Sequence, residues 1–231
     1  MRYFRAYQFL FDKSSGFVNL LLVALCQLIP LVGPIVSLGY GYEVVEYLHR
    51  KRGRNYPDFD FNRFVKYLGR GIWPFLVLLI VSVPMMFVYF LVWIMFAGVI
   101  SVVGKDLNPL AGIALFAAGF LFVIGSQVLL ALVAVPLSLH AGLSQELAFA
   151  SAWKFLCDFL KRVWQELLLV QLFLWGSSLV VTLMGLLACC VGVYPAVALI
   201  LLAQHHLHFQ LYELYLERGG REIPIMVDFA K

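Results

Sequence analysis

Four long apolar blocks constrain this chain more than any other feature of its sequence. They cover residues 17–48, 72–103, 109–139 and 166–212. An α-helix rises about 1.5 Å per residue and a bilayer core is about 30 Å thick, so roughly 20 apolar residues suffice for one crossing. Hydrophobic residues make up 63% of the chain and charged residues only 13%, whereas a soluble protein is about 25% charged. The sequence therefore predicts a polytopic membrane protein without a separate soluble domain.

Internal polar turns decide how these blocks divide into spans. The last block is too long for one crossing and divides at CCVGVYP, which predicts spans near 166–187 and 194–216. The second and third blocks contain no internal polar turn, and GKDLNP joins them as a polar loop. We therefore expect one span from each of these two blocks.

The first block allows two interpretations. A single helix over 17–48 would be about 48 Å long, whereas a hairpin turned at Leu31–Pro34 would have arms of only about 15 residues. The hairpin places 16 of the 17 lysines and arginines on one side of the membrane, with Lys105 opposite. Because basic residues accumulate on the cytoplasmic side, this distribution favours the hairpin and two cytoplasmic termini.

The resulting prediction is an all-α polytopic membrane protein with six transmembrane helices arranged as three hairpins. A basic, aromatic, amphipathic stretch precedes each hairpin and is expected to lie as a helix in the headgroup region. The single membrane domain, 1–231, divides into hairpin units over 1–52, 53–139 and 140–218, followed by a cytoplasmic tail over 219–231.

Basic residues of the second and third amphipathic stretches are candidates for contact with anionic lipid headgroups. The favoured interpretation is that these bases anchor the helices at the membrane surface and so set the topology. The more specific alternative is a binding site for a lipid headgroup or a partner. The candidate contacts are Arg63, Lys66, Arg70, Lys154, Lys161 and Arg162.

Two glutamates and two histidines form the candidate ion or proton site. Glu43 and Glu46 lie one turn apart near the cytoplasmic end of the second predicted span, where buried carboxylates are expensive and often functional. Pairing of Glu46 with Arg50 at the interface is the favoured alternative. His205 and His208, in QHHLHFQ, could share a metal with these glutamates. We favour neutral histidines that bond to neighbouring helices, a role that also suits the buried glutamines, and we expect no metal and no cofactor.

The remaining motifs are uninformative about chemistry. The sequence contains no Walker loop, Rossmann glycine pattern or nucleophile elbow, so an enzyme is not expected. The small net charge of +4 gives no support to nucleic-acid binding. Cys26 could form a disulfide with Cys189 or Cys190 near the outer face, although apolar packing is the favoured role of these cysteines.

A family resemblance covers most of the chain and is most specific in the first 70 residues. LIPLVGPIVSLGY, followed by a basic run, PDFD and an amphipathic helix, resembles the bacterial membrane family called domain of unknown function 4013. The resemblance implies a six-span protein of the bacterial inner membrane with no assigned activity. It transfers no catalytic residue to this chain.

Two functional hypotheses follow. The first is a non-enzymatic scaffold or accessory subunit that binds lipid and a membrane partner, either another protein or a second copy of itself. The alternative is a small transporter or channel for protons, cations or a small solute. A sealed apolar core with a broad exposed apolar face would favour the first, and a continuous buried polar cavity the second.

Overall fold

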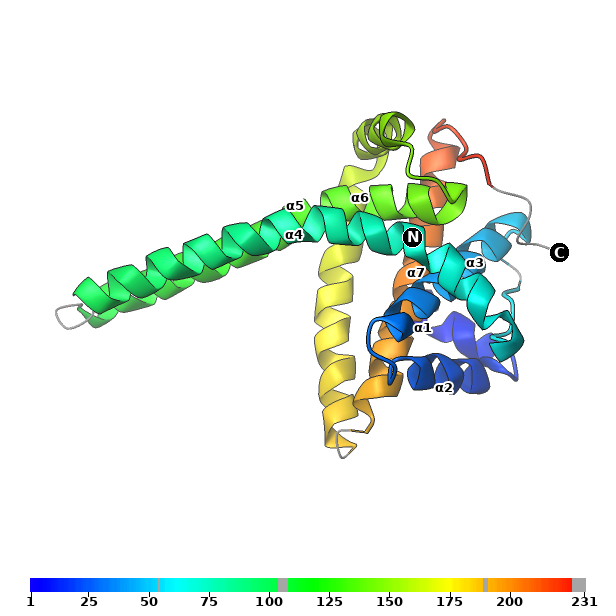
Figure 1. Cartoon of the computed structure of the whole chain (residues 1–231), viewed down its shortest axis with the longest axis horizontal. Coiled ribbons are helices and arrows are strands. Elements are labelled where there is room, and N and C mark those ends of the chain that lie inside the picture. Colours follow the sequence, from blue (N-terminus) through cyan, green and yellow to red (C-terminus); the bar gives the residue numbers. More distant parts are fainter. Residues whose placement is uncertain (54, 104–107, 189–190, 226–231) are drawn as a thin grey trace.

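A computed structural model of the chain describes residues 1–53, 55–103, 108–188 and 191–225 (Figure 1). Within these ranges the chain forms helices and connecting segments and contains no β-strand, which confirms the prediction of an all-α protein. The elements in chain order are α1 (Arg5–Gln8), η1 (Phe9–Asp12), α2 (Gly16–Cys26), α3 (Val32–Arg50), η2 (Phe61–Arg63), α4 (Phe64–Val103), α5 (Pro109–Ser144), α6 (Phe149–Leu187) and α7 (Val193–Glu217).

Helices α4 and α5 form a long hairpin that extends well beyond the rest of the molecule (Figure 1). With 40 residues, α4 is about 60 Å long, twice the thickness of a bilayer core. Asn108 begins α5 by accepting a hydrogen bond from the Leu110 amide (3.1 Å), and Pro109 occupies the first turn. We call the outer part of this hairpin, residues 83–100 and 110–123, the arm.

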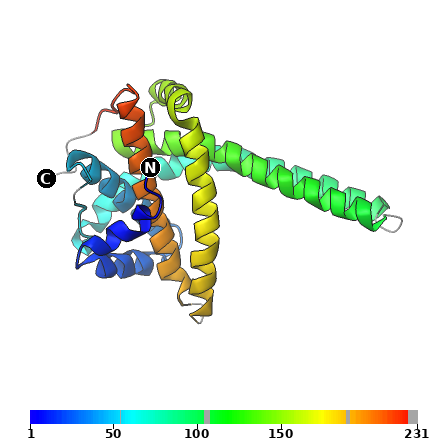
Figure 2. The ribbon, with the colours of Figure 1, turned by 180° about the vertical axis from the view of Figure 1, so that it is seen from behind.

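Helices α6 and α7 form a second hairpin, crosswise to the arm (Figure 2). Val163 has a non-helical backbone (φ −137°, ψ 21°) and bends α6 there. The bend separates a basic first part from the apolar remainder of the helix. We call the part of the molecule outside the arm the body. Helices α1, α2 and α3 pack against α7, which therefore runs through the interior of the body.

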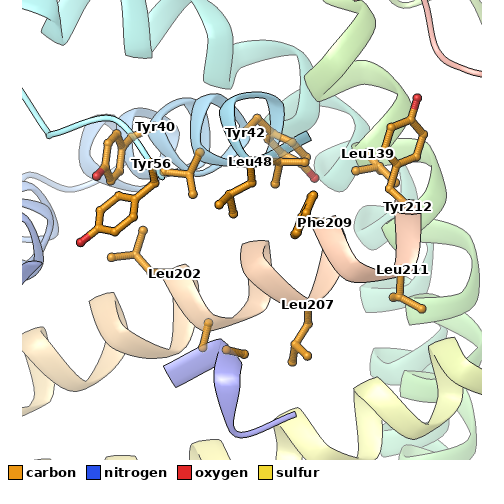
Figure 3. Packing of buried hydrophobic residues seen from close by; sticks show 14 of the residues in the cluster. Tyr40, Tyr42, Leu48, Tyr56, Leu139, Leu202, Leu207, Phe209, Leu211 and Tyr212 are labelled. Carbon is orange, nitrogen blue, oxygen red and sulfur yellow. The ribbon is translucent and has the colours of Figure 1, made fainter. Parts of the chain in front are cut away.

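The core of the body is rich in tyrosine (Figure 3). Tyr40, Tyr56 and Tyr212 are buried, and each hydroxyl bonds to a backbone group of another segment of the chain. Tyr40 donates to the Pro57 carbonyl (2.9 Å), and the Tyr212 oxygen accepts from the Ile223 amide (2.9 Å). Because a tyrosine combines a large apolar ring with a polar end, these residues fill the core and also hold the connecting segments against it.

Three helices of the described chain are long and apolar enough to cross a membrane. They are Phe61–Ile100, Leu110–Ser144 and Phe149–Leu187; a fourth span results if Arg5–Asp12 and Gly16–Cys26, which meet at 110°, count as one broken span. The chain is accordingly a membrane protein by the length and composition of its helices, whereas the predicted arrangement of six spans is not confirmed. The 11 residues of α2 reach about 16 Å, half of a bilayer core.

The first apolar block does turn, as the hairpin interpretation requires. Helix α2 ends at Cys26 and α3 begins at Val32, so one continuous helix over 17–48 is wrong. Leu31 has a positive φ of 65°, a conformation uncommon for a residue other than glycine, and it lies at the point where the chain reverses. The connection between the helices, residues 27–31, therefore overlaps the predicted turn at Leu31–Pro34 only at Leu31, and Pro34 occupies the first turn of α3.

The second amphipathic stretch is not a separate helix. Residues from Phe64 onward run directly into the apolar part of α4, and only the three-residue η2 precedes them. Extensive packing of α3 against α4 accounts for this continuity, because the contact with α3 stabilises helical backbone through the region where we expected a break.

Candidate functional site

Glu43 and Glu46 are both buried on α3, and they bind arginines of η2 and α4 respectively. Glu43 accepts from Arg63 (2.5 Å), and Glu46 accepts from Arg70 (2.5 Å). Glu46 also accepts from Arg50 (2.8 Å), which is the pair expected from the spacing of four residues. The two carboxylates therefore join the end of α3 to the beginning of α4.

The six candidate headgroup residues divide by residue type. Lys66, Lys154 and Lys161 are exposed on the surface. Arg63 and Arg70 face the glutamates of α3, and Arg162 bonds to Asp158 (3.1 Å) and to the Arg218 carbonyl oxygen. The arginines thus hold helices together, whereas the three lysines are exposed on the surface.

The PDFD segment is an anchor for the connection between α3 and α4. Asp58 accepts hydrogen bonds from Lys13 (2.6 Å), Ser15 (2.6 Å) and Asn19 (2.9 Å). Chiefly because of the Lys13 hydrogen bond, the pKa of the Asp58 carboxyl is lowered to about 2. Asp60 caps η2 by accepting from the Asn62 amide (2.9 Å). These contacts explain locally why acidic residues occur at both positions of this segment.

Helix α7 places its histidines in two different environments. His206 stacks on Phe9 with a centroid distance of 4.4 Å and bonds to Gln210 (3.0 Å). His205 and His208 lie on another face, with their ring centroids 5.9 Å apart. Within the described part of the chain, no three His, Cys, Asp or Glu side chains are grouped so that they could hold a metal ion.

A cavity of about 170 Å³ lies where α3, α4, α5, α6 and α7 meet. His205 and His208 both line it, but neither Glu43 nor Glu46 does. The candidate carboxylates and histidines therefore belong to two separate clusters. Apolar atoms make up most of the wall, although seven of the lining residues carry polar groups: Tyr42, Gln127, Ser138, Gln171, Gln204, His205 and His208.

Two buried histidines beside this cavity have ring nitrogens without a hydrogen-bond partner in the described structure. The Nδ1 atom of His205 lies 2.7 Å from the Leu201 carbonyl oxygen, but its Nε2 atom has no partner among the residues with described positions. The same is true of both ring nitrogens of His208. Tyr42 and Ser138 were not predicted as site residues. Tyrosine and serine are common in apolar helices, and only the packing of α3 against α5 brings these two together.

The cysteine prediction is tested only in part. Cys26 is buried and has a free thiol, and Cys157 is free and exposed. Cys189 and Cys190, the expected alternatives for pairing, lie outside the described residues.

The helices, the buried ion pairs and the absence of strands in the described ranges define an all-helical protein with membrane-spanning character. The chain belongs to the family of proteins of unknown function DUF4013, whose model matches residues 22–190. No curated protein and no solved structure matches the chain. The matched region ends before α7, so the family match includes neither histidine of the cavity.

Proposed function

We propose that this protein is a non-enzymatic scaffold or accessory subunit of the bacterial inner membrane, with both termini in the cytoplasm. In this role the arm contacts lipid and a membrane partner, and the exposed lysines contact anionic headgroups. The candidate acids are engaged in ion pairs, and the sequence lacks a recognisable catalytic motif, which supports a binding role over a catalytic one.

Exposure of the arm is the observation that carries this proposal. Trp93 in α4 is 75% exposed, and Phe116 in α5 is 77% exposed. An apolar surface of this extent is not stable in water and marks contact with a membrane or a partner. The large apolar side chains exposed on the arm are Val83, Met86, Phe87, Val88, Phe90, Leu91, Trp93, Ile94, Met95, Val99, Ile100, Leu110, Ile113, Phe116, Phe120, Leu121, Phe122 and Val123.

Small residues beside these side chains favour a protein partner in addition to lipid. An added Cβ at Gly112 would meet no atom within 4 Å, and the same holds for Gly125 just beyond the arm. Because lipid chains are as apolar as leucine, helices in a bilayer associate chiefly where small residues permit close approach. Helix α5 offers such positions next to large exposed side chains.

Photocrosslinking in cells tests the proposal. We would place a photoreactive amino acid at Trp93 or Phe116, and at the fully buried Leu207 as a control. We expect a protein adduct of defined mass above 26.1 kDa from the two arm positions and none from Leu207. A mass of twice 26.1 kDa would identify a second copy as the partner. Lipid adducts alone at both arm positions would contradict the accessory role.

Transport of protons or cations is the alternative. It would use Glu43 and Glu46, but the arginines that bind both carboxylates oppose the exchange of a proton or cation there. Ion uptake by the reconstituted protein distinguishes the two functions. We expect liposomes containing wild-type protein to be as tight as empty ones across several ions and pH gradients, and flux that is lost on replacing both glutamates by glutamine would favour transport.

A further inference from the structure

We propose that His49, Glu213 and Glu222 form a pH-dependent latch that holds residues 222–225, here called the Glu222 segment, against the end of α3. The latch is closed while the His49 ring carries two protons and opens when the ring loses one of them. It is independent of the scaffold role, because none of its residues belongs to the arm. The contacts of His49, the different supports of the two acids and the other contacts of the segment support this proposal.

His49 lies between two carboxylates at the end of α3. Its Nδ1 atom bonds to Glu213 of α7, and its Nε2 atom lies 3.2 Å from Oε1 of Glu222. An ionised carboxylate only accepts hydrogen bonds, so both ring nitrogens donate and the ring is an imidazolium. The pKa of His49 is accordingly raised above its ordinary value, chiefly by the hydrogen bond to Glu213. The side chain of His49 is 17% exposed and lies outside the three helices that can cross a membrane, so protons in water have access to it.

The neighbouring charged groups do not replace the proton of His49. The basic residues that follow it in the chain are Arg50, Lys51 and Arg52. Arg50 lines the same open hollow as Glu222, but its guanidinium bonds to Glu46 (2.8 Å). The next two bases are exposed, so water and salt screen their charges. From α7, the uncharged ring of Tyr212 faces the imidazole edge-on, with 5.3 Å between the centroids.

The two carboxylates differ in how firmly they are held. Glu213 belongs to the regular helix α7 and its side chain is 37% exposed, whereas Glu222 follows that helix and its side chain is 65% exposed. Loss of one proton leaves a neutral ring with one donor and one acceptor. The donor remains on Nδ1, because the contact with Glu213 is the shorter one. The lone pair of Nε2 then faces Glu222 and repels it, so the contact with the Glu222 segment is the one that breaks.

Two backbone hydrogen bonds also position this part of the chain. The Arg221 amide donates to the Tyr215 hydroxyl (3.0 Å), and the Ile223 amide donates to the Tyr212 hydroxyl (2.9 Å). Because the ordinary pKa of tyrosine is about 10, these bonds do not titrate near neutral pH. The Ile223 amide therefore reports on the latch: opening loosens the Glu222 segment beside it and increases the exchange of this amide with water.

The latch closes on the acid side of the titration. The folded-state pKa of His49 is raised, so its contact with Glu222 is fully present below the ordinary pKa of 6.5. The contact is lost as the pH rises through the raised pKa of the folded protein.

Amide hydrogen exchange of the full chain in lipid nanodiscs tests the latch. We would follow Ile223 from about pH 5.5 to about pH 9 and correct every rate for the intrinsic effect of pH on exchange. We expect exchange to become about threefold faster across the titration, as suits the loss of a partly exposed ion pair. Corrected exchange around Leu207, inside α7, should stay constant. Nuclear magnetic resonance of ¹⁵N-labelled histidine should show that His49 titrates with the same midpoint, above 6.5.

Variants connect the response to His49 and Glu222. His49→Gln cannot be charged and should exchange fast at Ile223 at every pH, whereas His49→Arg is always charged and should exchange slowly throughout. Glu222→Gln should abolish the pH dependence. Glu217→Gln, at an exposed acid of α7, is the matched control and should retain it. Exchange at Ile223 that is independent of pH in the wild type, or that keeps its pH dependence in His49→Gln or Glu222→Gln, would overturn the proposal. A His49 midpoint at or below 6.5 would also overturn it.

Discussion

At the scale of single residues, Glu46 illustrates how much of an ion pair can be inferred from spacing. Arg50 follows it by four positions, so their pairing on one helix face was predictable. Arg70 lies on another helix, α4, and its side chain is only 3% exposed. An arginine that contacts lipid headgroups at the membrane surface would have a much larger exposed fraction. The sequence shows Arg70 as one base in an amphipathic stretch, and the packing of α4 against α3 turns it inward.

Burial of Arg70 predicts unequal effects of two similar substitutions. Glu46→Gln leaves a buried guanidinium without its carboxylate and should lower the free energy of unfolding by about 3 kcal/mol. Glu43→Gln affects Arg63, whose side chain is 29% exposed and can be hydrated, and should cost about 1 kcal/mol or less. Unfolding of both variants in a mixed-detergent titration measures the difference. Equal losses would contradict the buried role of Arg70.

Asp58 predicts a dependence of stability on acid. Its pKa is about 2 in the folded protein against 3.8 for the unperturbed group, so its hydrogen bonds stabilise the fold fully above pH 3.8. That contribution is lost as the pH falls from 3.8 through 2. Wild type should therefore melt at a higher temperature than Asp58→Asn near neutral pH, and the difference should shrink across this window. A difference that stays constant down to pH 2 would contradict the assignment.

At the scale of elements, two glycines permit the contact between α3 and α4. An added Cβ at Gly39 would lie 1.8 Å from the Tyr67 carbonyl oxygen, and one at Gly71 would lie 1.8 Å from the Ile35 carbonyl oxygen. Both obstacles are backbone atoms, which cannot move aside without separating the helices. This close approach places Arg63 and Arg70 within reach of the glutamates.

Alanine substitutions test this crossing. Gly71→Ala should destabilise the protein by more than 2 kcal/mol through overpacking and should weaken the ion pairs beside it. Gly69→Ala is the matched control on the same helix, because nothing lies within 4 Å of its added Cβ. The control should be neutral or stabilising by up to about 1 kcal/mol, since alanine favours a helix more than glycine does. The two melting temperatures give the comparison, and a neutral Gly71→Ala would show that the helices do not cross this closely.

At the scale of the whole molecule, the arm and the α6–α7 hairpin lie in different directions (Figures 1 and 2). In this arrangement they cannot both follow the bilayer normal. The angle between the two hairpins cannot be predicted from the sequence, because each apolar block satisfies the length requirement for a span separately. The distribution of basic residues is independent of it and still favours cytoplasmic termini.

Reporter fusions test the topology. Fusions at Asn55 and Gln145 should report from the cytoplasm, and fusions at Asn108 and Gly192 from outside, because the basic residues flank the former positions. Leu31 should also report from outside if the first hairpin crosses the membrane. A cytoplasmic signal from Leu31 alone would show that α2, at about 16 Å, only enters the bilayer. Cytoplasmic signals from Asn108 and Gly192 would contradict the topology as a whole.

The sequence by itself determined the class of protein, the helical content, the division at the Leu31 turn and the pairing of Glu46 with Arg50. These features depend on composition, on apolar length and on the spacing of residues along one helix, all of which are local. Only the tertiary structure decided that Glu43 binds Arg63 of η2 and Glu46 binds Arg70 of α4, while His205 and His208 line a separate cavity with Tyr42 and Ser138. The physical reason is that partners on different helices are selected by how closely the backbones approach, and two glycines set that approach between α3 and α4.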